Sequence, residues 1–284
     1  MSLKTLGVTL GDPAGIGPEV VSAALEVWTP PHGLAIEVAG SAEGHRPGEP
    51  TDASARAALE AMETAAAKLR SGAWAGVVTG PVSKNQLHRI GYAFPGQTEF
   101  FAAAAGIDDF AMCLTGRGLT VGLVTVHVPY SGVPTLLSEA EIVRVGRLLI
   151  DFLRRRGVPS PRVAVCGLNP HAGENGDLGR EEIEIIAPAV RALGDGFFGP
   201  EPPDTVFFRA VRGEFDGVLC MYHDQGLIPL KLHAFDAGVN VTLGLPFVRT
   251  SPDHGTAFGI AGKGQARPDS VLAALDLAAE LIRI

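Results

Sequence analysis

The chain has 284 residues, of which 46% are hydrophobic and 19% charged, and its formal net charge at pH 7 is −8. This composition is typical of a globular protein with a sizeable core and not of a disordered chain. The Lys and Arg residues are scattered over an acidic chain, and no apolar run reaches the roughly 18 residues that a membrane span needs. We therefore expect neither nucleic acid nor a membrane among its partners.

The cysteines and the N-terminus indicate a compartment. Cys113, Cys166 and Cys220 are widely spaced and lie in apolar runs. An odd number of cysteines in such settings is typical of reduced core residues, not of a disulfide framework or a zinc knuckle. The N-terminus has no basic head followed by the apolar core of a signal peptide. We predict a cytoplasmic protein.

The first part of the chain alternates predicted strands and helices. Strands are expected at 6–10, 36–40 and 75–79, and helices at 20–28 and 53–70. The stretch GDPAGIGPE at 11–19 links the first strand to the first helix. It either holds an anion on backbone N–H groups or is a tight turn. Residues 41–52 are rich in Gly, Pro and charge, which indicates an exposed loop.

Polar residues follow the strand at 75–79 and precede the apolar helical stretch 100–105. Lys84 comes after a Gly-Pro turn and is either solvated or functional. Thr98 either caps the helix or reaches a ligand, and capping is the commoner role.

The rest of the chain continues the alternation, which predicts a mostly parallel sheet. A hairpin of strands at 111–114 and 119–126 is expected around 115–118. Further strands are expected at 163–168, 218–222 and 239–243, and helices at 138–156, from 179–182 and at 269–284, with a turn at 201–204 and a polar loop at 249–257. Ser138 and Glu141 match a capping box at the start of the longest of these helices.

Three strand-like runs end at or near a histidine, namely His127, His171 and His223. In an open α/β sheet, ligands bind beyond the carboxyl ends of the strands. A single histidine is more often a hydrogen-bonded structural residue. Three in this setting predict one convergent site, where neutral imidazoles would hold a metal ion. Because the histidines lack short ligand spacing, the fold must assemble such a site.

Charged residues near these runs supply further chemistry. Asp224 could orient His223, bind the metal or act as a base. Lys231 and Arg249 are suited to holding an anion, since Arg grips a phosphate or carboxylate with two N–H groups and Lys carries a compact charge. The loop 253–256 suits a nucleotide as well as an ordinary turn.

Five motifs can be compared with known families: GDPAGIGPE at 11–19, GPVSK at 80–84, NPHAGENGDLGREE at 169–182, YHDQGLIPLK at 222–231 and VNVTLGLPFVRTSPDHGTAF at 239–258. Together they resemble the 4-hydroxythreonine-4-phosphate dehydrogenase family of pyridoxal phosphate biosynthesis, along nearly the whole chain. The resemblance implies an isocitrate/isopropylmalate dehydrogenase-like fold with two α/β domains around a cleft. The expected nucleotide-side domain is 1–108 with 245–284, and the expected metal, substrate and dimerisation domain is 109–244.

The resemblance also implies a reaction. It is the NAD-dependent, divalent-metal-assisted oxidation of 4-phosphohydroxy-L-threonine, or of a similar phosphorylated hydroxy acid, to a β-keto acid that decarboxylates. Zn, Mg or Co would serve as the metal, and the enzyme would be a homodimer with shared active sites. The carried-over residues are His127, His171 and His223 for the metal; Gln97, Thr98, Lys231, Asn240 and Arg249 for the substrate; Asp253, His254 and Thr256 for NAD; and Lys231 and Asp224 for catalysis.

Two departures from the family pattern leave alternatives open. Gln97 stands where the family usually has His, and Ser41–Asp52 is much shorter than the family norm. Both fit a paralogous dehydrogenase of 4-phospho-erythronate, 4-phospho-threonate or a cis-diol carboxylate. A metal-dependent hydrolase or aldolase that does not use NAD, and a catalytically silent ligand-sensing dimer, are the remaining hypotheses.

Overall fold

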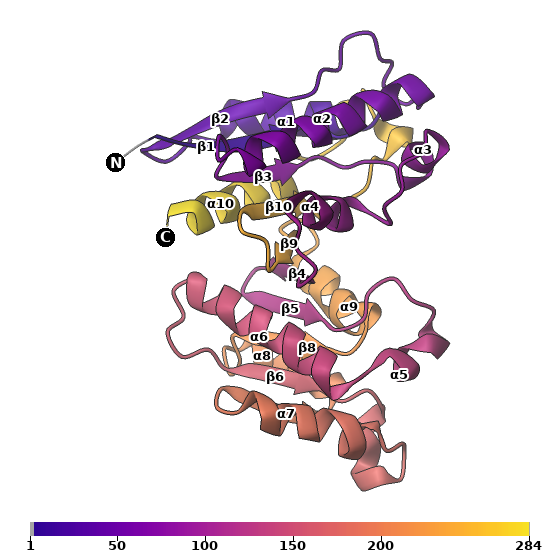
Figure 1. Cartoon of the computed structure of the whole chain (residues 1–284), viewed down its shortest axis with the longest axis vertical. Coiled ribbons are helices and arrows are strands. Elements are labelled where there is room, and N and C mark those ends of the chain that lie inside the picture. Colours follow the sequence, from indigo (N-terminus) through magenta and orange to yellow (C-terminus); the bar gives the residue numbers. More distant parts are fainter. Residues whose placement is uncertain (1–2, 284) are drawn as a thin grey trace. The chain divides into compact units, whose positions relative to one another are not determined.

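The computed structural model describes residues 3–283, and the chain divides into two compact units (Figure 1). The first unit runs to Asp108 and resumes at Leu245, and the second unit is Asp109–Gly244. In residues 3–283 no helix has the length and apolar character that crossing a membrane requires.

The first unit is built on parallel strands with the order β2-β1-β3-β10. The strands are β1 Lys4–Thr9, β2 Leu34–Ala39, β3 Gly76–Thr79 and β10 Val248–Pro252; the helices are α1 Gly17–Val27, α2 Asp52–Arg70, α3 Lys84–Arg89, α4 Gln97–Ala105, η4 Phe258–Ile260 and α10 Asp269–Arg283. Helices cover both faces of the sheet (Figure 1). A Cβ on Gly76 would lie 2.9 Å from Ile282 of α10, whereas one on Gly7 would lie 1.9 Å from the Trp74 ring, beside α2.

The second unit has the strand order β9-β4-β5-β8-β6-β7. The strands are β4 Ala111–Gly116, β5 Leu119–Leu123, β6 Val163–Cys166, β7 Phe197–Glu201, β8 Gly217–Cys220 and β9 Val239–Leu243; the helical segments are η1 Tyr130–Gly132, α5 Val133–Leu136, α6 Glu139–Arg155, η2 Pro170–Gly176, η3 Glu182–Ile186, α7 Ala187–Leu193, α8 Pro203–Val211 and α9 His223–Ala234. β4 is antiparallel to β5 and β9, but β5, β8 and β6 are parallel neighbours. Their carboxyl ends therefore lie at one edge of the sheet.

The three cysteines lie inside the core of the second unit. All three are free and buried, and burial raises the pKa of the Cys113 thiol to about 12. Cys166 and Cys220 belong to the apolar cluster on which α8 and α9 pack. This arrangement agrees with the prediction that they are reduced core residues.

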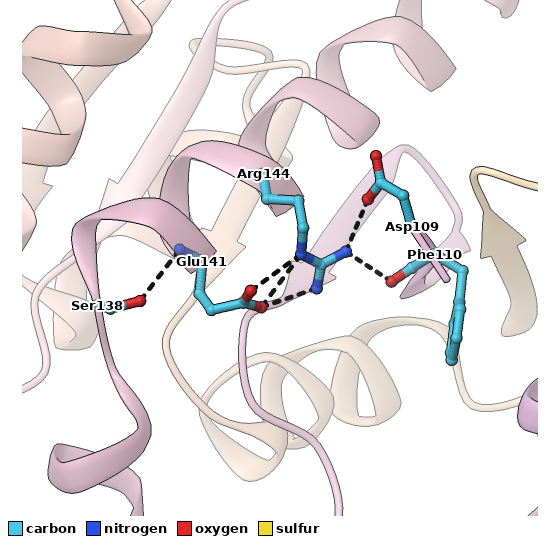
Figure 2. A network of polar contacts seen from close by, with 5 residues as sticks. All are labelled: Asp109, Phe110, Ser138, Glu141 and Arg144. Carbon is cyan, nitrogen blue, oxygen red and sulfur yellow. Dashed lines mark hydrogen bonds and ion pairs between the residues drawn. The ribbon is translucent and has the colours of Figure 1, made fainter. Parts of the chain in front are cut away.

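The long helix α6 begins as the sequence predicts but for a partly different reason. Ser138 caps it by accepting a hydrogen bond from the Glu141 N–H (3.2 Å), and Figure 2 shows this contact. The Glu141 carboxylate does not reach back to complete a capping box; it binds the Arg144 guanidinium instead. Arg144 also donates to the Asp109 carboxylate and to the Phe110 carbonyl oxygen, both 2.9 Å (Figure 2), which fastens the start of the second unit to α6.

Several local predictions were wrong or incomplete. Arg249 to Pro252 form β10 and not a loop, Gly96 and not Thr98 is the N-cap of α4, and β7 and α8 were not foreseen. Nor did the sequence indicate α9, because Gly226 and Pro229 usually interrupt helices. Gly226 nevertheless allows close packing there, since a Cβ at this position would lie 3.0 Å from Cys220 Sγ and the neighbouring side chains would have to shift.

Candidate active site

The three histidines follow the neighbouring strand ends of the second unit, as the sequence predicts. His127 lies beyond β5, His223 is the first residue of α9 after β8, and His171 lies in η2 after β6. Backbone and side-chain contacts join the first two strand ends. Val124 N–H donates to Cys220 O (2.9 Å), and the Thr125 hydroxyl donates to Met221 O (2.7 Å).

His127 and His223 line a pocket of about 460 Å³. Their ring centroids are 5.7 Å apart, and Asp224 lines the same pocket with its Oδ1 2.7 Å from His223 Nδ1. A carboxylate in this position favours the tautomer with hydrogen on Nδ1, which leaves the Nε2 lone pair available to a metal. We call His127, His223 and Asp224 the histidine pocket.

Two tyrosines form the wall of this pocket. The Tyr130 and Tyr222 rings meet edge to face at 5.1 Å, and the Tyr130 hydroxyl donates to the Tyr222 hydroxyl (3.3 Å). Burial, followed by the contact with Tyr130, raises the pKa of Tyr222 above its ordinary value. Tyr222 is therefore a neutral, half-buried wall residue and not an acid that titrates near neutral pH.

His171 does not complete a metal set with the other two within the chain. In residues 3–283 no three His, Cys, Asp or Glu side chains form a group that would hold a metal ion. His171 is exposed and belongs to the turn 171–175, in which every residue has positive φ. Its assignment as a ligand stays a prediction.

The second unit also carries the predicted substrate residues Lys231 and Asn240. Lys231 lies on α9, eight residues after His223, which is about 12 Å along a helix axis. Asn240 lies on β9 opposite Leu114 of β4. Its Oδ1 is buried and receives no hydrogen bond from the residues that the structure describes. A buried carbonyl oxygen of this kind is suited to accept a hydrogen bond from a ligand.

The first unit buries an arginine among hydroxyl groups. Arg249 is 3% exposed, and it donates to Thr79 Oγ1 (2.8 Å) and to Thr98 Oγ1 (3.2 Å). Burial lowers its pKa to about 10, although the charge of Glu99 acts in the opposite direction. We call Arg249, Thr79 and Thr98 the arginine site. The site therefore places a buried positive charge beside two hydroxyl groups, a combination that suits the binding of an anion.

Gln97 lies next to this site in the first turn of α4. Its Nε2 donates to Gly80 O (3.1 Å), while its Oε1 is buried without a hydrogen-bond donor among the described residues. The structure thus brings together Gln97, Thr98 and Arg249, all predicted from the sequence, and adds Thr79, which the sequence analysis missed. Thr79 is the last residue of the buried strand β3. Its closeness to Arg249 follows only from the pairing of β3 with β10, which the sequence does not reveal.

The predicted nucleotide loop packs on the glycine-rich loop of the first unit. Ile16 N–H donates to Thr256 O (2.9 Å), and a Cβ on Gly15 would lie 2.9 Å from that same oxygen. Asp253 N–H donates to Ser270 Oγ (3.2 Å), and His254 is half-buried. The motif at 11–19 and the loop 253–256 are therefore two parts of one surface.

Comparison with known proteins identifies the family. A model of the family described as "Pyridoxal phosphate biosynthetic protein PdxA" matches residues 19–278. The chain belongs to the PdxA family. A relative from Erythrobacter litoralis named 4-hydroxythreonine-4-phosphate dehydrogenase is 43% identical over 323 residues, covering 98% of this chain and 96% of the relative. Because 323 exceeds the 284 residues of this chain, the PdxA relative has positions that the chain lacks.

Solved structures agree with this membership of the PdxA family. The 4-hydroxythreonine-4-phosphate dehydrogenase of Klebsiella pneumoniae is 39% identical, with a TM-score of 0.87 over 100% of this chain and 99% of that chain. A terephthalate 1,2-cis-dihydrodiol dehydrogenase from Burkholderia xenovorans is 29% identical, with a TM-score of 0.68 and 98% of both chains covered. The chain is thus an oxidoreductase, and its family implies a nicotinamide dinucleotide and a divalent metal in general terms.

A more distant structure bears on the fold alone. The isocitrate dehydrogenase of Methylococcus capsulatus is 16% identical, with a TM-score of 0.52 over 99% of this chain and 88% of that chain. The predicted isocitrate dehydrogenase-like α/β fold is confirmed.

Proposed function

We propose that the chain oxidises 4-phosphohydroxy-L-threonine with NAD and a divalent metal, giving a β-keto acid that decarboxylates, in the cytoplasm. The observation that carries the proposal is the likeness, along nearly the whole chain, to relatives named 4-hydroxythreonine-4-phosphate dehydrogenase. The residues of each unit support separate parts of this chemistry.

The arginine site is the proposed holder of an anionic group of the substrate. A phosphate or carboxylate would bind the buried Arg249 guanidinium beside the Thr79 and Thr98 hydroxyls. Charge-assisted hydrogen bonds of this type are roughly twice as strong as neutral ones. Lys231 and Asn240 are the proposed further contacts, with Asn240 Oδ1 accepting a hydrogen bond from a substrate hydroxyl or ammonium group.

The histidine pocket is the proposed metal site, with His171 as the third ligand. The donor chemistry fits, because two imidazoles lie 5.7 Å apart at a pocket and Asp224 orients one of them. Zn, Co and, less usually with imidazole, Mg are the candidate ions. When bound, the ion would polarise the substrate's hydroxyl and carboxylate, and NAD would take up the hydride.

The remaining roles belong to the protein. Asp224 would hold His223 in the metal-binding tautomer, and Lys231 is the proposed proton carrier for the substrate hydroxyl and the decarboxylated product. Asp253, His254 and Thr256 are the proposed contacts to NAD. Their support is the packing of this loop against the glycine-rich loop, whose Ala14 to Gly17 backbone is buried close to the start of α1.

A homodimer with shared active sites is the proposed assembly. The helix α9 and its C-cap present Ile228, Leu232 and Phe235 at helical spacing, with exposed fractions of 66%, 88% and 75%. Three large apolar side chains on one exposed helix face are typical of an interface. Since the same helix begins with His223, a second copy bound there would lie close to the histidine pocket.

The alternative substrate class is a cis-diol carboxylate, supported by the likeness to the terephthalate dihydrodiol dehydrogenase. That likeness, at 29% identity, is weaker than the 39% and 43% to the 4-hydroxythreonine-4-phosphate enzymes, so we favour the phosphorylated substrate. A hydrolase or aldolase with the same histidines would need no NAD. Calorimetric titration with NAD, with and without substrate, separates these cases, because the absence of NAD affinity in both states would favour the hydrolase or aldolase.

The decisive experiment compares His171→Ala with His32→Ala, an exposed histidine outside both sites. We expect His171→Ala to lose metal binding by calorimetry and NADH production from phosphorylated hydroxythreonine, while His32→Ala keeps both. Undiminished turnover in His171→Ala would reject the metal assignment. The same steady-state panel, with phosphorylated aldonic acids and with NADP in place of NAD, assigns the substrate and the cofactor.

A further inference from the structure

Gln225 is a buried polar residue that joins two of the histidine segments. It is 6% exposed, its Oε1 accepts a hydrogen bond from Met221 N–H (2.7 Å), and its Nε2 donates one to Gly167 O (2.7 Å). Met221 precedes His223 by two residues, and Gly167 precedes His171 by four. One side chain therefore links the end of β8 to the end of β6, beyond the last backbone pairs of the two strands.

The orientation of this amide is set by its partners. Met221 N–H can only donate and Gly167 O can only accept, so the oxygen of Gln225 faces the first and the nitrogen the second. An ionised glutamate in its place would keep the hydrogen bond from Met221 N–H, but its second oxygen would be repelled by the Gly167 carbonyl oxygen. A methionine would make neither bond, and each buried group left without a partner costs about 1–3 kcal/mol.

The segment that Gln225 holds on the β6 side is strained. His171, Ala172, Gly173, Glu174 and Asn175 have φ values of 53°, 52°, 80°, 42° and 58°. Only one of the five is glycine, and the left-handed region is sterically unfavourable for the other four residues. Such a turn persists only where its surroundings fix it, and it occurs mostly where a side chain must be aimed.

A buried carboxylate fixes the same turn from the other side. Glu182 is 3% exposed, and its Oε1 accepts from Leu168 N–H and Asn169 N–H, both at 2.7 Å. Its Oε2 accepts from Asn169 Nδ2 (3.0 Å) and lies 2.6 Å from where a Cβ on Gly173 would be, so that this position has room only for glycine. The start of the His171 turn is thus held between Glu182 and Gln225.

We infer that Gln225 is a positioning residue that fixes the His171 turn relative to the His223 segment before any ligand binds. The assignment of these histidines to a metal rests on the proposed function, but the fixing of the turn does not. Met221 contacts both neighbouring histidine segments. Its N–H donates to Gln225, and its C=O accepts a hydrogen bond from the hydroxyl of Thr125, two residues before His127. The hydrogen bonds of Met221 therefore connect all three histidine segments.

The test compares Gln225→Met and Gln225→Glu with Gln265→Glu, an exposed control that carries the same charge change. The first measurement is amide hydrogen exchange of the metal-free protein. We expect residues 168–176 to exchange about 5- to 100-fold faster in both Gln225 variants and at the wild-type rate in the control. Unchanged exchange of this segment would overturn the inference. If Gln225→Met does not fold, the isosteric Gln225→Glu alone decides.

The second measurement is Co²⁺ binding by calorimetry and by visible absorption, at temperatures where each variant is folded. A residue that only stabilises the core would lower the melting temperature and leave both unchanged. We expect a fall of about 10- to 100-fold in Co²⁺ affinity and an altered Co²⁺ spectrum. Faster exchange in the variants with no Co²⁺ binding even by the wild type would reject the proposed metal site and support the inference. Faster exchange with unaltered Co²⁺ affinity would support the fixing of the turn by Gln225 and would reject the assignment of His171 as a Co²⁺ ligand.

Discussion

The arginine site of the first unit is fully assembled within one chain, whereas the histidine pocket of the second unit brings together only two of its three predicted histidine ligands. Arg249, Thr79 and Thr98 are all buried and come from two neighbouring strands and a helix, and Arg249 donates a hydrogen bond to each threonine. His127 and His171 are exposed on segments that follow strand ends, and His223 is half-buried. Burial and its own hydrogen bonds therefore fix the arginine site, whereas the histidine segments depend on hydrogen bonds that involve Asp224, Thr125 and Gln225.

The difference follows from the ligands that the two sites would bind. A positive charge that is already buried and fixed in the folded protein can bind an anion, because the cost of desolvating that charge arises on folding and not on binding. A metal needs several ligands at nearly equal distances, which side chains on adjustable segments achieve as the ion binds. A second copy of the chain bound at α9 would add side chains to the exposed histidine pocket. The buried arginine site would need no such addition.

Replacing Arg249 should have the largest effect. We expect Arg249→Met to lower kcat/KM for the phosphorylated substrate by about 10²- to 10³-fold, since a buried charge-assisted contact is worth several kcal/mol. The free energy of unfolding should change little, because two effects oppose each other. The pKa of Arg249 is lowered from 12.5 to about 10, so the variant is spared a burial cost of at most about 3 kcal/mol. It also removes the hydrogen bonds from Arg249 to the buried Thr79 and Thr98 hydroxyls, which costs about 1–3 kcal/mol each.

The effect of Arg249→Met on the free energy of unfolding should not depend on pH in the neutral range. Below pH 10 Arg249 is charged in both the folded and the unfolded state, so its cost to stability is constant there and is relieved only as pH rises above 10. The difference in unfolding free energy between Arg249→Met and wild type, measured by urea titration, should therefore be flat from about pH 6 to 9. Arg147→Met, at an exposed arginine, is the control. A loss of stability without loss of kcat/KM would show that Arg249 is a structural residue.

Replacing Asp224 tests the histidine pocket. Asp224→Asn can still accept a hydrogen bond from His223 but without the charge, and we expect the affinity for Zn²⁺ or Co²⁺ to fall about 10- to 100-fold. Binding of NAD should be unchanged, because the predicted NAD contacts belong to the first unit. Asp195→Asn, at an exposed carboxylate, serves as the control. Equal metal affinity in both variants would remove Asp224 from the site.

The dependence of the pocket on a second copy can be tested through α9. Leu232→Glu places a charge on the most exposed residue of the apolar face formed with Ile228 and Phe235 and should weaken the proposed dimer by about tenfold or more, as measured by light scattering over a dilution series. Metal affinity should then fall with dilution in the variant. Phe208→Glu, at an exposed apolar residue of α8, is the matched control. A variant that remains dimeric would exclude this helix face as the interface.

The sequence predicted that three histidines follow strand ends, and the structure places His127, His171 and His223 after β5, β6 and β8, because each follows an apolar run that forms a strand of one sheet. Their role as metal ligands stays a prediction. Gln225 and Thr79 could not be predicted, since their partners are 58 and 170 residues away in the chain. The polar sequence Arg249-Thr250-Ser251 predicts a loop, but the residues form a fully buried strand. Their polar groups are hydrogen-bonded inside the protein; the Thr250 hydroxyl, for example, donates to Ala274 O (2.9 Å).

The smallest effect is expected at Gln97, which lies next to the arginine site. Its Nε2 already donates to Gly80 O, so its buried Oε1 is the atom left to select a substrate, and it can only accept. Gln97→His would supply a ring nitrogen that can donate, which favours an anionic group over a hydroxyl donor. We expect the ratio of kcat/KM for phosphorylated hydroxythreonine to that for 4-phospho-erythronate to change by about 3- to 10-fold, the value of one neutral hydrogen bond. Gln265→His should leave that ratio unaltered. If Gln97→His matches wild type on every compound, the fixed geometry of Arg249 and Thr98 sets the specificity, and the glutamine is a neutral replacement.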